Sequence, residues 1–275
     1  MAAPIYLVVI ADDFGMSPSI NAGIVETFQQ GLLTTTTLMA PCPSFGHAVA
    51  LAHETAIPLG VHLTFNAEWD GYRWASLTGL PSLAGEDGRL PKTKPEAQRA
   101  MLPAELLAEA RAQVLAVYKA GLKPTHLDSH MGTIYPYVAE LAALCREFRL
   151  PFRFPVAGRP ELSVQFDTSV AGGEALSPQP VEKKGPWLLN YLENLKPGFH
   201  MLCGHPAQPG SEMHTFLGSD TATELRNWAV YFRLSDRDQL LNPQARAIVE
   251  KRGIKRINFK DVIRLQKWKA PKTKP

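Results

Sequence analysis

The sequence predicts an α/β protein, an irregular (β/α) barrel of the TIM type with seven parallel strands in the sheet and helices outside it. Short strand-like runs alternate with helix-like segments along the chain. No internal repeat and no long linker interrupts this alternation. The 275 residues, of which 45% are hydrophobic, suffice for one large core. We therefore expect a single domain over residues 1–266 and a basic flexible tail over residues 267–275.

Seven segments have the character of buried parallel strands. They cover residues 5–11, 33–39, 59–65, 125–128, 152–154, 200–204 and 255–258. Because a regular barrel of this type has eight strands, seven segments predict an irregular one.

Helices are expected between these strands, and three of them have readable ends. Each begins with a proline at its first position and stops at a glycine, as caps and helix stops predict. They run from Pro18, after the N-cap Ser17, to Gly31, from Pro103 to Gly121, and from Pro243, after Asn242, to Gly253. Two stretches, 67–93 and 156–186, are rich in Gly and Pro and are expected to be long irregular loops.

The first of these loops carries three aromatic residues, Trp69, Tyr72 and Trp74. They have two interpretations. They pack a small satellite core under the loop, or they form a platform on which sugar rings of a substrate stack.

The charge of the chain is nearly balanced, with 29 basic and 26 acidic residues and a formal charge of +3. Much of the excess lies in the tail, at Lys267, Lys269, Lys272 and Lys274. No basic stripe interleaved with aromatic residues occurs, so nucleic acid is not an expected partner. The sequence leaves a monomer and a homo-oligomer both open.

Cysteine content and hydropathy bear on location. The three cysteines, Cys42, Cys145 and Cys203, are odd in number and show no C-x-x-C spacing, which fits a reducing cytoplasm. No segment approaches the roughly 20 apolar residues that span a bilayer. The apolar run at the N-terminus has no basic region before it and leads into two aspartates, so we expect a core strand and not a signal peptide.

Polar residues follow the predicted strands at their carboxyl ends, where barrel enzymes gather their reactive groups. These residues are Asp12, Asp13, His62, His130, Arg153 and His205. One aspartate and two histidines can hold a divalent cation and leave positions open for water and substrate. A second carboxylate can then take a proton from the water, and another histidine can protonate a leaving amine. The pattern predicts metal-assisted amide hydrolysis.

Each of these residues also has a structural interpretation. One aspartate of the pair can cap the following helix, and a strand histidine is often a core residue bonded to backbone. Arg153 can be a surface ion-pair residue. We expect a structural role for His126, which sits deeper in its strand, and a buried thiol at Cys203 rather than a nucleophile.

At these residues the chain resembles the YdjC-like carbohydrate deacetylase family, which includes chitooligosaccharide and hopanoid-biosynthesis deacetylases. The matching motifs are A-D-D-F-G-M-S at 11–17, G-V-H-L-T at 60–64, H-L-D-S-H at 126–130, F-R-F-P at 152–155 and G-H-P at 204–206. They come in the family's order. One motif departs from the family pattern: many members continue D-S-H with further histidines, where this chain has Met131 and Gly132.

The resemblance implies a deformed (β/α) barrel, one divalent metal ion, zinc or magnesium, and removal of an N-acetyl group from an acetylated amino sugar or oligosaccharide. By position, it implies that Asp13, His62 and His130 are the metal ligands. Asp12 would be the general base, His205 the general acid, and Arg153 would orient Asp12 or the substrate.

Two other functions remain in view. The first is a different metal hydrolase on the same barrel, acting on a phosphoester or a cyclic amide, although a phosphatase would need more basic residues than Arg153 at the rim. The second is a non-catalytic sugar-binding protein, which would be expected to have lost the base or the acid.

Overall fold

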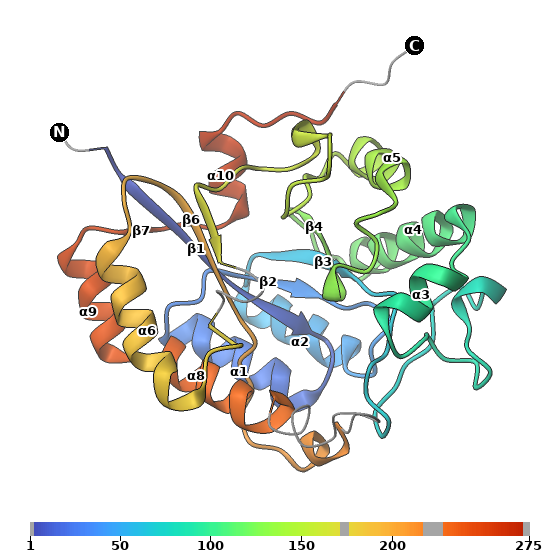
Figure 1. Ribbon diagram of the computed structural model, residues 1–275, viewed down its shortest axis with the longest axis horizontal. Coiled ribbons are helices and arrows are strands. Elements are labelled where there is room, and N and C mark those ends of the chain that lie inside the picture. Colours follow the sequence, from blue (N-terminus) through green and yellow to red (C-terminus); the bar gives the residue numbers. More distant parts are fainter. Residues whose placement is uncertain (1–2, 171–175, 217–227, 272–275) are drawn as a thin grey trace.

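The protein is built on a parallel seven-stranded sheet, seen in a computed structural model that describes residues 3–170, 176–216 and 228–271 (Figure 1). The strand order is β4-β3-β2-β1-β6-β5, and β7 pairs with the start of β1. The strands are β1 (Ile5–Phe14), β2 (Thr35–Leu38), β3 (Leu59–Leu63), β4 (Leu127–Ser129), β5 (Thr168–Val170), β6 (Gly198–Gly204) and β7 (Lys255–Arg256). The predicted α/β class and the parallel sheet are therefore confirmed.

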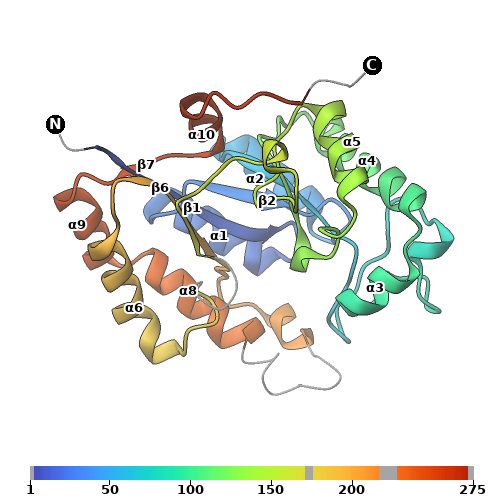
Figure 2. The ribbon, with the colours of Figure 1, turned by 45° about the horizontal axis from the view of Figure 1, so that its top comes forward.

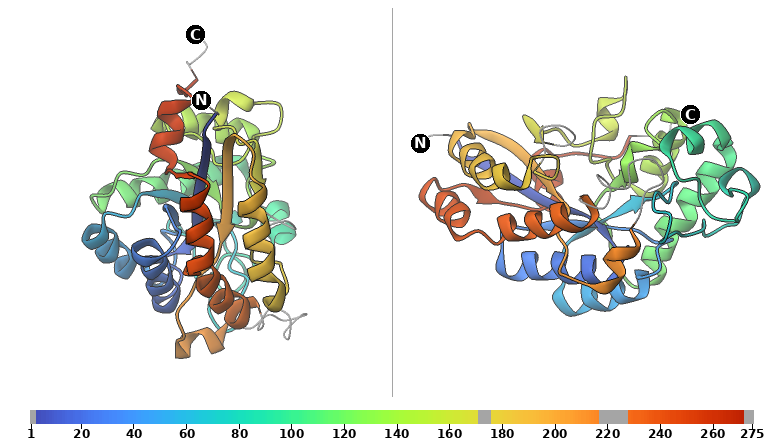
Figure 3. Two further views of the ribbon diagram at one scale, coloured as in Figure 1. Left: turned by 90° about the vertical axis from the view of Figure 1, so that its left-hand side faces the viewer. Right: turned by 60° about the horizontal axis from the view of Figure 1, so that its bottom comes forward.

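Helices surround this sheet. They are α1 (Pro18–Gln30), α2 (Phe45–Thr55), α3 (Lys94–Ala100), α4 (Pro103–Lys119), α5 (Val138–Phe148), α6 (Val181–Asn194), α8 (Arg233–Leu240), α9 (Pro243–Lys251) and α10 (Phe259–Leu265). The three helices with readable ends form as predicted. The Ser17 side chain accepts a hydrogen bond from the Ile20 N–H at the start of α1. Helix α6 packs against α8 and α9 along one flank of the sheet (Figure 3).

Alternating residues of β1 divide the interior into two cores. Leu7 and Val9 face the large core that the sheet shares with helices such as α1. Val8 and Ile10 point to the opposite face, which we call the inner face, and pack there against Phe259 of α10. Figure 2 shows α1 and α10 on opposite sides of the sheet. Helix α10 thus covers the inner face near the start of the strands. Polar residues occupy the inner face near the carboxyl ends of the strands.

The predicted strand at 152–154 does not form. Phe152 makes only isolated parallel bridges, to Leu127 and to Ser163. Pro151 and Pro155 flank it, and proline has no N–H to extend a ladder. The fifth strand, β5, lies instead within 156–186, which was expected to be a loop and which also contains the start of α6. No β4–β5 pairing closes the sheet in the described part of the chain, so the hydrogen-bonded barrel is open there.

The predicted tail begins with a packed residue. Trp268 lies partly buried against the core, and its indole N–H donates to the Glu161 carbonyl at 3.0 Å. Lys272 and Lys274 lie outside the described residues. Among the helices in the described ranges, none combines the length and the apolar character needed to cross a membrane.

Candidate active site

The alternation of the strands brings the predicted polar residues to one place. Asp12 continues the inner face of β1 after Val8 and Ile10. Cys203 shares the inner face of β6 with Met201. All six residues singled out from strand ends lie in one connected group of contacts at the carboxyl end of the sheet, linked through Asp12, Asp13 and Asp128.

A bulge at the end of β1 aims the two adjacent aspartates at different partners. The pairing with β2 slips between Ala11 and Phe14, so one extra residue is accommodated there. Asp13 takes a left-handed backbone conformation with φ of 73°. Gly15 follows with φ of 99°, and a side chain there would press on the Met39 carbonyl at 3.0 Å. The left-handed backbone of Asp13 is uncommon for a residue other than glycine, and such conformations cluster at functional sites.

Three atoms of the predicted metal ligands form a compact triangle. Asp13 Oδ1 lies 3.5 Å from His62 Nε2 and 3.3 Å from His130 Nδ1, and the two ring nitrogens are 3.3 Å apart. All three side chains are buried. The other oxygen of Asp13 is held by Arg233 of α8, whose Nη2 donates to Oδ2 at 2.6 Å.

Two further carboxylates orient the histidines of the triangle. His62 Nδ1 lies 3.1 Å from Asp128 Oδ2, and His130 Nε2 lies 3.0 Å from Glu68 Oε2. In the neutral form of each ring, the carboxylate favours the proton on the nitrogen that faces it, which turns the lone pairs of His62 Nε2 and His130 Nδ1 into the triangle. Such pairs of carboxylate and histidine are typical of metal sites in proteins.

The triangle fits a divalent cation. Ligand atoms around a tetrahedral ion with bonds of about 2.0–2.1 Å lie roughly 3.3–3.4 Å apart, close to the observed separations. Within the described residues, Asp13 Oδ1 is buried without a hydrogen bond of good geometry, and so is His62 Nδ1, whose contact with Asp128 is an ion-pair distance. Three acceptor atoms facing one another in a buried space need a positive charge between them. A mixed oxygen and nitrogen donor set suits zinc and is also open to other divalent ions.

The electrostatics of the triangle favour positive charge within it. Without a metal ion that charge is carried by protons on the two histidines, which a bound cation would replace. Burial opposes the charged form of both histidines, yet Asp12, Asp128 and Asp13 raise the pKa of His62 to about 9. Glu68 and Asp13, likewise acting against burial, raise the pKa of His130 to about 10. Burial works against ionisation of Asp13 too, but Arg233 and the two histidines hold its pKa well below the usual range.

Asp12 sits beside the triangle with a different set of partners. Arg153 Nη1 donates to Asp12 Oδ1 at 2.5 Å and to Asp128 Oδ2 at 2.7 Å. Thr37 donates to the same Oδ1 at 3.0 Å. Burial raises the pKa of Asp12, but Arg153 and His62 outweigh it and leave the pKa below its ordinary value. Asp12 is therefore a carboxylate at neutral pH, and Oδ1 is the oxygen that Arg153 and Thr37 hold.

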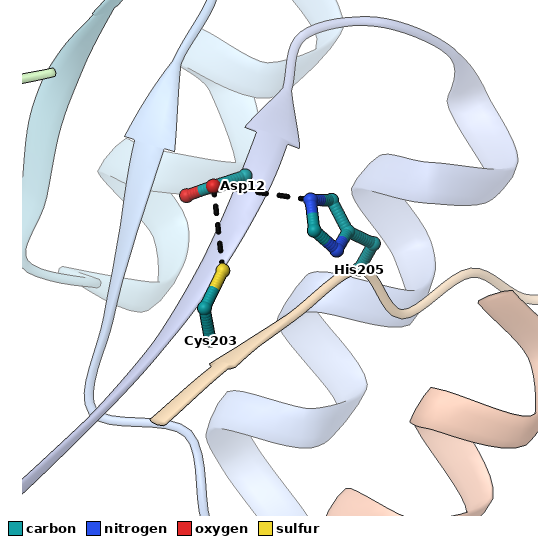
Figure 4. Close-up of side chains that lie close together, drawn as sticks. All are labelled: Asp12, Cys203 and His205. Carbon is teal, nitrogen blue, oxygen red and sulfur yellow. Dashed lines mark hydrogen bonds and ion pairs between the residues drawn. The ribbon is translucent and has the colours of Figure 1, made fainter. Parts of the chain in front are cut away.

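His205 faces this second oxygen. Its Nε2 lies 3.8 Å from Asp12 Oδ2 (Figure 4). Its Nδ1 lies 2.7 Å from Ser177 Oγ, and the Ser177 hydroxyl donates in turn to Asp236. Asp236 also accepts from the His205 backbone N–H at 2.8 Å and pairs with the buried Lys184. Burial lowers the pKa of His205.

The residues of this arrangement that were not predicted from the sequence include Glu68, Ser177, Arg233 and Asp236. Glu68 lies in the 67–93 loop and Ser177 in the 156–186 stretch, where strand periodicity gives no guide. Arg233 and Asp236 stand three residues apart on α8, and both are buried. That spacing places both side chains on one helix face, and it was the only sequence signal available for them.

The aromatic residues of the 67–93 loop are largely covered. Trp69 and Trp74 are 1% and 3% exposed. Trp69 stacks on Phe216, and Tyr72 meets the same ring edge-on while donating to the Met16 carbonyl at 2.9 Å. This packing fits the satellite core that the sequence left as an alternative. Separately, His126 stacks on Phe259 beneath the site, as its expected structural role requires.

Comparison with known protein families gives a match over most of the chain. The family model described as YdjC-like protein matches residues 6–251. A crystal structure of an Enterococcus faecalis V583 protein, described by its authors in terms of cellobiose-phosphate cleavage, superposes with a TM-score of 0.76 at 22% identity. The superposition covers 94% of this chain and 99% of that one, and it shows a shared fold.

Two relatives carry names that refer to deacetylation. A Geobacillus stearothermophilus protein named carbohydrate deacetylase is 36% identical over 163 residues, which are 57% of this chain and 62% of that protein. That alignment spans less than two thirds of the relative. A chitooligosaccharide deacetylase from Serratia marcescens is 31% identical over 278 residues, covering 93% of this chain and 98% of that protein.

Proposed function

Because the chain belongs to the YdjC-like family, we propose that it is a metal-dependent hydrolase that removes an N-acetyl group from an acetylated amino sugar or oligosaccharide. One observation carries the proposal. A triangle of ligand atoms from Asp13, His62 and His130 lies beside a carboxylate and an imidazole that face each other, Asp12 and His205. The names of the relatives from Geobacillus and Serratia support the substrate class.

The residues of the triangle hold the metal in this proposal. A divalent cation bound there would lower the pKa of a water molecule and polarise the acetyl carbonyl. With a cation bound, Asp128 and Glu68 would hold the proton of each ring on its outer nitrogen and leave the inner nitrogens as ligand atoms. Arg233 neutralises one oxygen of Asp13 and leaves the other as a single ligand atom. Zinc and magnesium are the two candidates for the native ion.

Asp12 acts as the general base. Its ligand atom lies within 4.8 Å of those of His62 and Asp128, so it borders the metal ligands without being required among them. Arg153 fixes Oδ1 and keeps the group ionised, which leaves Oδ2 to take a proton from the attacking water. Arg153 therefore acts by orienting the base.

His205 acts as the general acid. Ser177 and Asp236 hold the Nδ1 proton, so the proton delivered to the departing amine is carried on Nε2. Because Nε2 lies 3.8 Å from Asp12 Oδ2, a proton captured by Asp12 is close to the group that must pass it on. Acetate and the free amino sugar are the products.

The chain differs from many relatives at the residues after His130. Met131 is about half exposed beside the site, and its sulfur lies 3.0 Å from the Asn66 side-chain amide. A thioether in place of a histidine removes a hydrogen-bonding group from this edge. We therefore propose that the preferred sugar differs from chitooligosaccharide.

The unpaired thiols of all three cysteines fit a cytoplasmic location.

The test is acetate release from a panel of N-acetylated mono- and oligosaccharides, before and after treatment with a chelator. We expect at least one substrate to release acetate, with activity lost on metal removal and restored by a divalent ion. Acetate release that survives complete removal of metal would contradict the proposal. So would a phosphoester or cyclic amide turned over while every N-acetylated sugar is left intact.

A further inference from the structure

Asp12, Cys203 and His205 form a second group of metal-ligating side chains beside the first. Figure 4 shows the three side chains turned toward one another from β1, β6 and the residue that follows β6. Cys203 Sγ lies 3.3 Å from Asp12 Oδ2, and His205 Nε2 lies 3.8 Å from the same oxygen. The three ligand atoms all lie within 4.8 Å of one another. None of these atoms belongs to the Asp13 triangle.

The hydrogen bonds to Asp12 and His205 leave Asp12 Oδ2 and His205 Nε2 directed at each other, and Arg153 also contacts the Cys203 side chain. Ser177 donates to Asp236 and so can only accept from His205 Nδ1, which puts the lone pair of a neutral His205 on Nε2. Arg153 and Thr37 occupy Asp12 Oδ1, which leaves Oδ2 on the side of the thiol and the imidazole. Two acceptor atoms therefore face each other, and the thiol of Cys203 supplies the nearest S–H.

We propose that Asp12, Cys203 and His205 form a second site for a soft divalent cation such as Zn²⁺. Carboxylate oxygen, imidazole nitrogen and thiolate sulfur are all ligands that zinc takes in proteins. Binding forms a metal–sulfur bond and breaks the S–H bond, and the proton of the thiol passes to solvent. The thiol is 3% exposed and His205 lies at the edge of the site, so a cation reaches the group from the side of His205.

The second site has a consequence for activity, and that consequence alone rests on the proposed function. A cation bound there ties up the oxygen of Asp12 that takes the proton and the nitrogen of His205 that donates it. Zinc in excess of the first equivalent should therefore inhibit the enzyme. The binding itself does not depend on which reaction the protein catalyses.

The binding is tested by titrating the metal-free protein with Co²⁺ and following the near-ultraviolet absorption that a cobalt–thiolate bond produces. We expect two ions per chain in the wild type, one of them with the thiolate band. Because loss of a residue that only orients a ligand weakens metal binding roughly 10- to 100-fold, Cys203→Ala should weaken the second site at least that much and abolish the band. Cys145→Ala removes a buried thiol that contacts the Leu162 carbonyl instead, and should leave both unchanged.

Two further measurements keep the proposal falsifiable. His62→Ala should lose the first ion and keep the thiolate band. X-ray absorption of wild-type protein with two zinc equivalents should show a sulfur neighbour at about 2.3 Å, which holds even if Cys203→Ala fails to fold. A single ion per chain with no sulfur neighbour would overturn the second site and leave the proposed deacetylase untouched. A sulfur-bound ion in a protein that releases no acetate from any sugar would support the second site and contradict the proposed deacetylase.

Discussion

The two halves of the site, one around Asp13 and one around Asp12, are built from neighbouring residues but differ in how firmly their groups are held. Around Asp13, the three ligand atoms are 3.3 to 3.5 Å apart, and each histidine has a carboxylate on its outer nitrogen. Around Asp12, the imidazole is 3.8 Å away and its side chain is 20% exposed. The first half has the dimensions of an ion site, and the second is looser and reaches solvent at His205.

This difference indicates how one bulge in β1 can serve two tasks. Asp13, turned by its left-handed backbone, is tied to α8 through Arg233 and cannot move without breaking a buried ion pair. Asp12 keeps one oxygen anchored by Arg153 and the other directed at groups that exchange protons. The bulge separates a ligand from a base that are adjacent in sequence.

Removal of a histidine from the Asp13 triangle should have the largest effect on the contrast between the two halves of the site. His62→Ala should abolish stoichiometric metal binding at the Asp13 side and with it nearly all activity, because a two-ligand site holds a divalent ion poorly. Metal analysis by mass spectrometry after dialysis checks this. His53→Ala, which alters an exposed histidine bonded to the Ala120 carbonyl, is the matched control. Full metal content in His62→Ala would exclude this residue from the metal site.

Asp12→Asn addresses the other half. The substitution keeps the shape of the side chain but removes the proton acceptor, so kcat should fall by roughly 10²- to 10⁴-fold, the usual contribution of general acid–base catalysis. The ion of the Asp13 triangle should be retained, because Asp13 supplies that ligand. Parallel metal analysis and acetate-release kinetics measure both quantities. A variant that has lost the ion of the Asp13 triangle would show that the two aspartates exchange roles.

Glu68→Gln tests whether Glu68 orients His130 in the Asp13 triangle. The amide cannot hold the Nε2 proton of His130 as a carboxylate does, and such changes weaken metal binding about 10- to 100-fold. Once metal is saturating, kcat should return close to the wild-type value. Competition with a chromophoric chelator gives the affinity. Glu86→Gln, in an exposed part of the same loop region, should bind metal like the wild type, and equal affinities of the two variants would leave Glu68 without this role.

How far the sequence could predict this site follows from the same contrast. Asp12, Asp13, His62, His130, Arg153 and His205 could be picked out because strand ends meet at one edge of a parallel sheet. Arg153 was found although its expected strand did not form, since Phe152 still bridges to Leu127 and carries the arginine to the inner face. The position of Arg153 in an extended segment was enough to predict that it reaches the site. The predicted pairing of that segment did not need to be correct.

The supporting residues could not be found in this way. Arg233 and Asp236 reach the site only because α8 packs across the end of β6, a contact between segments far apart in the sequence. Ser177 lies in a turn before α6, and nothing local distinguishes it from neighbouring polar residues. The open barrel has a similar origin: β5 is a short Thr-Ser-Val run whose pairing depends on β6, not on its own apolar pattern.

Ser177→Ala gives the smallest expected effect and tests the looser half. Loss of one hydrogen bond worth about 1 kcal/mol should lower kcat roughly 3- to 10-fold, with KM and the ion of the Asp13 triangle unchanged. Without the Ser177 oxygen, the protonated form of His205 loses a partner, so the pKa of His205 falls further below its ordinary value than burial already places it. A general acid with a lower pKa is deprotonated sooner as pH rises, and the alkaline limb of the kcat profile should therefore move to lower pH.

Ser163→Ala, at a buried serine bonded to the Pro160 carbonyl, should leave that limb in place. A Ser177→Ala profile that overlays the wild type would mean that His205 is held by its backbone contact to Asp236 alone, and that the proton side of the site is as rigid as the metal side.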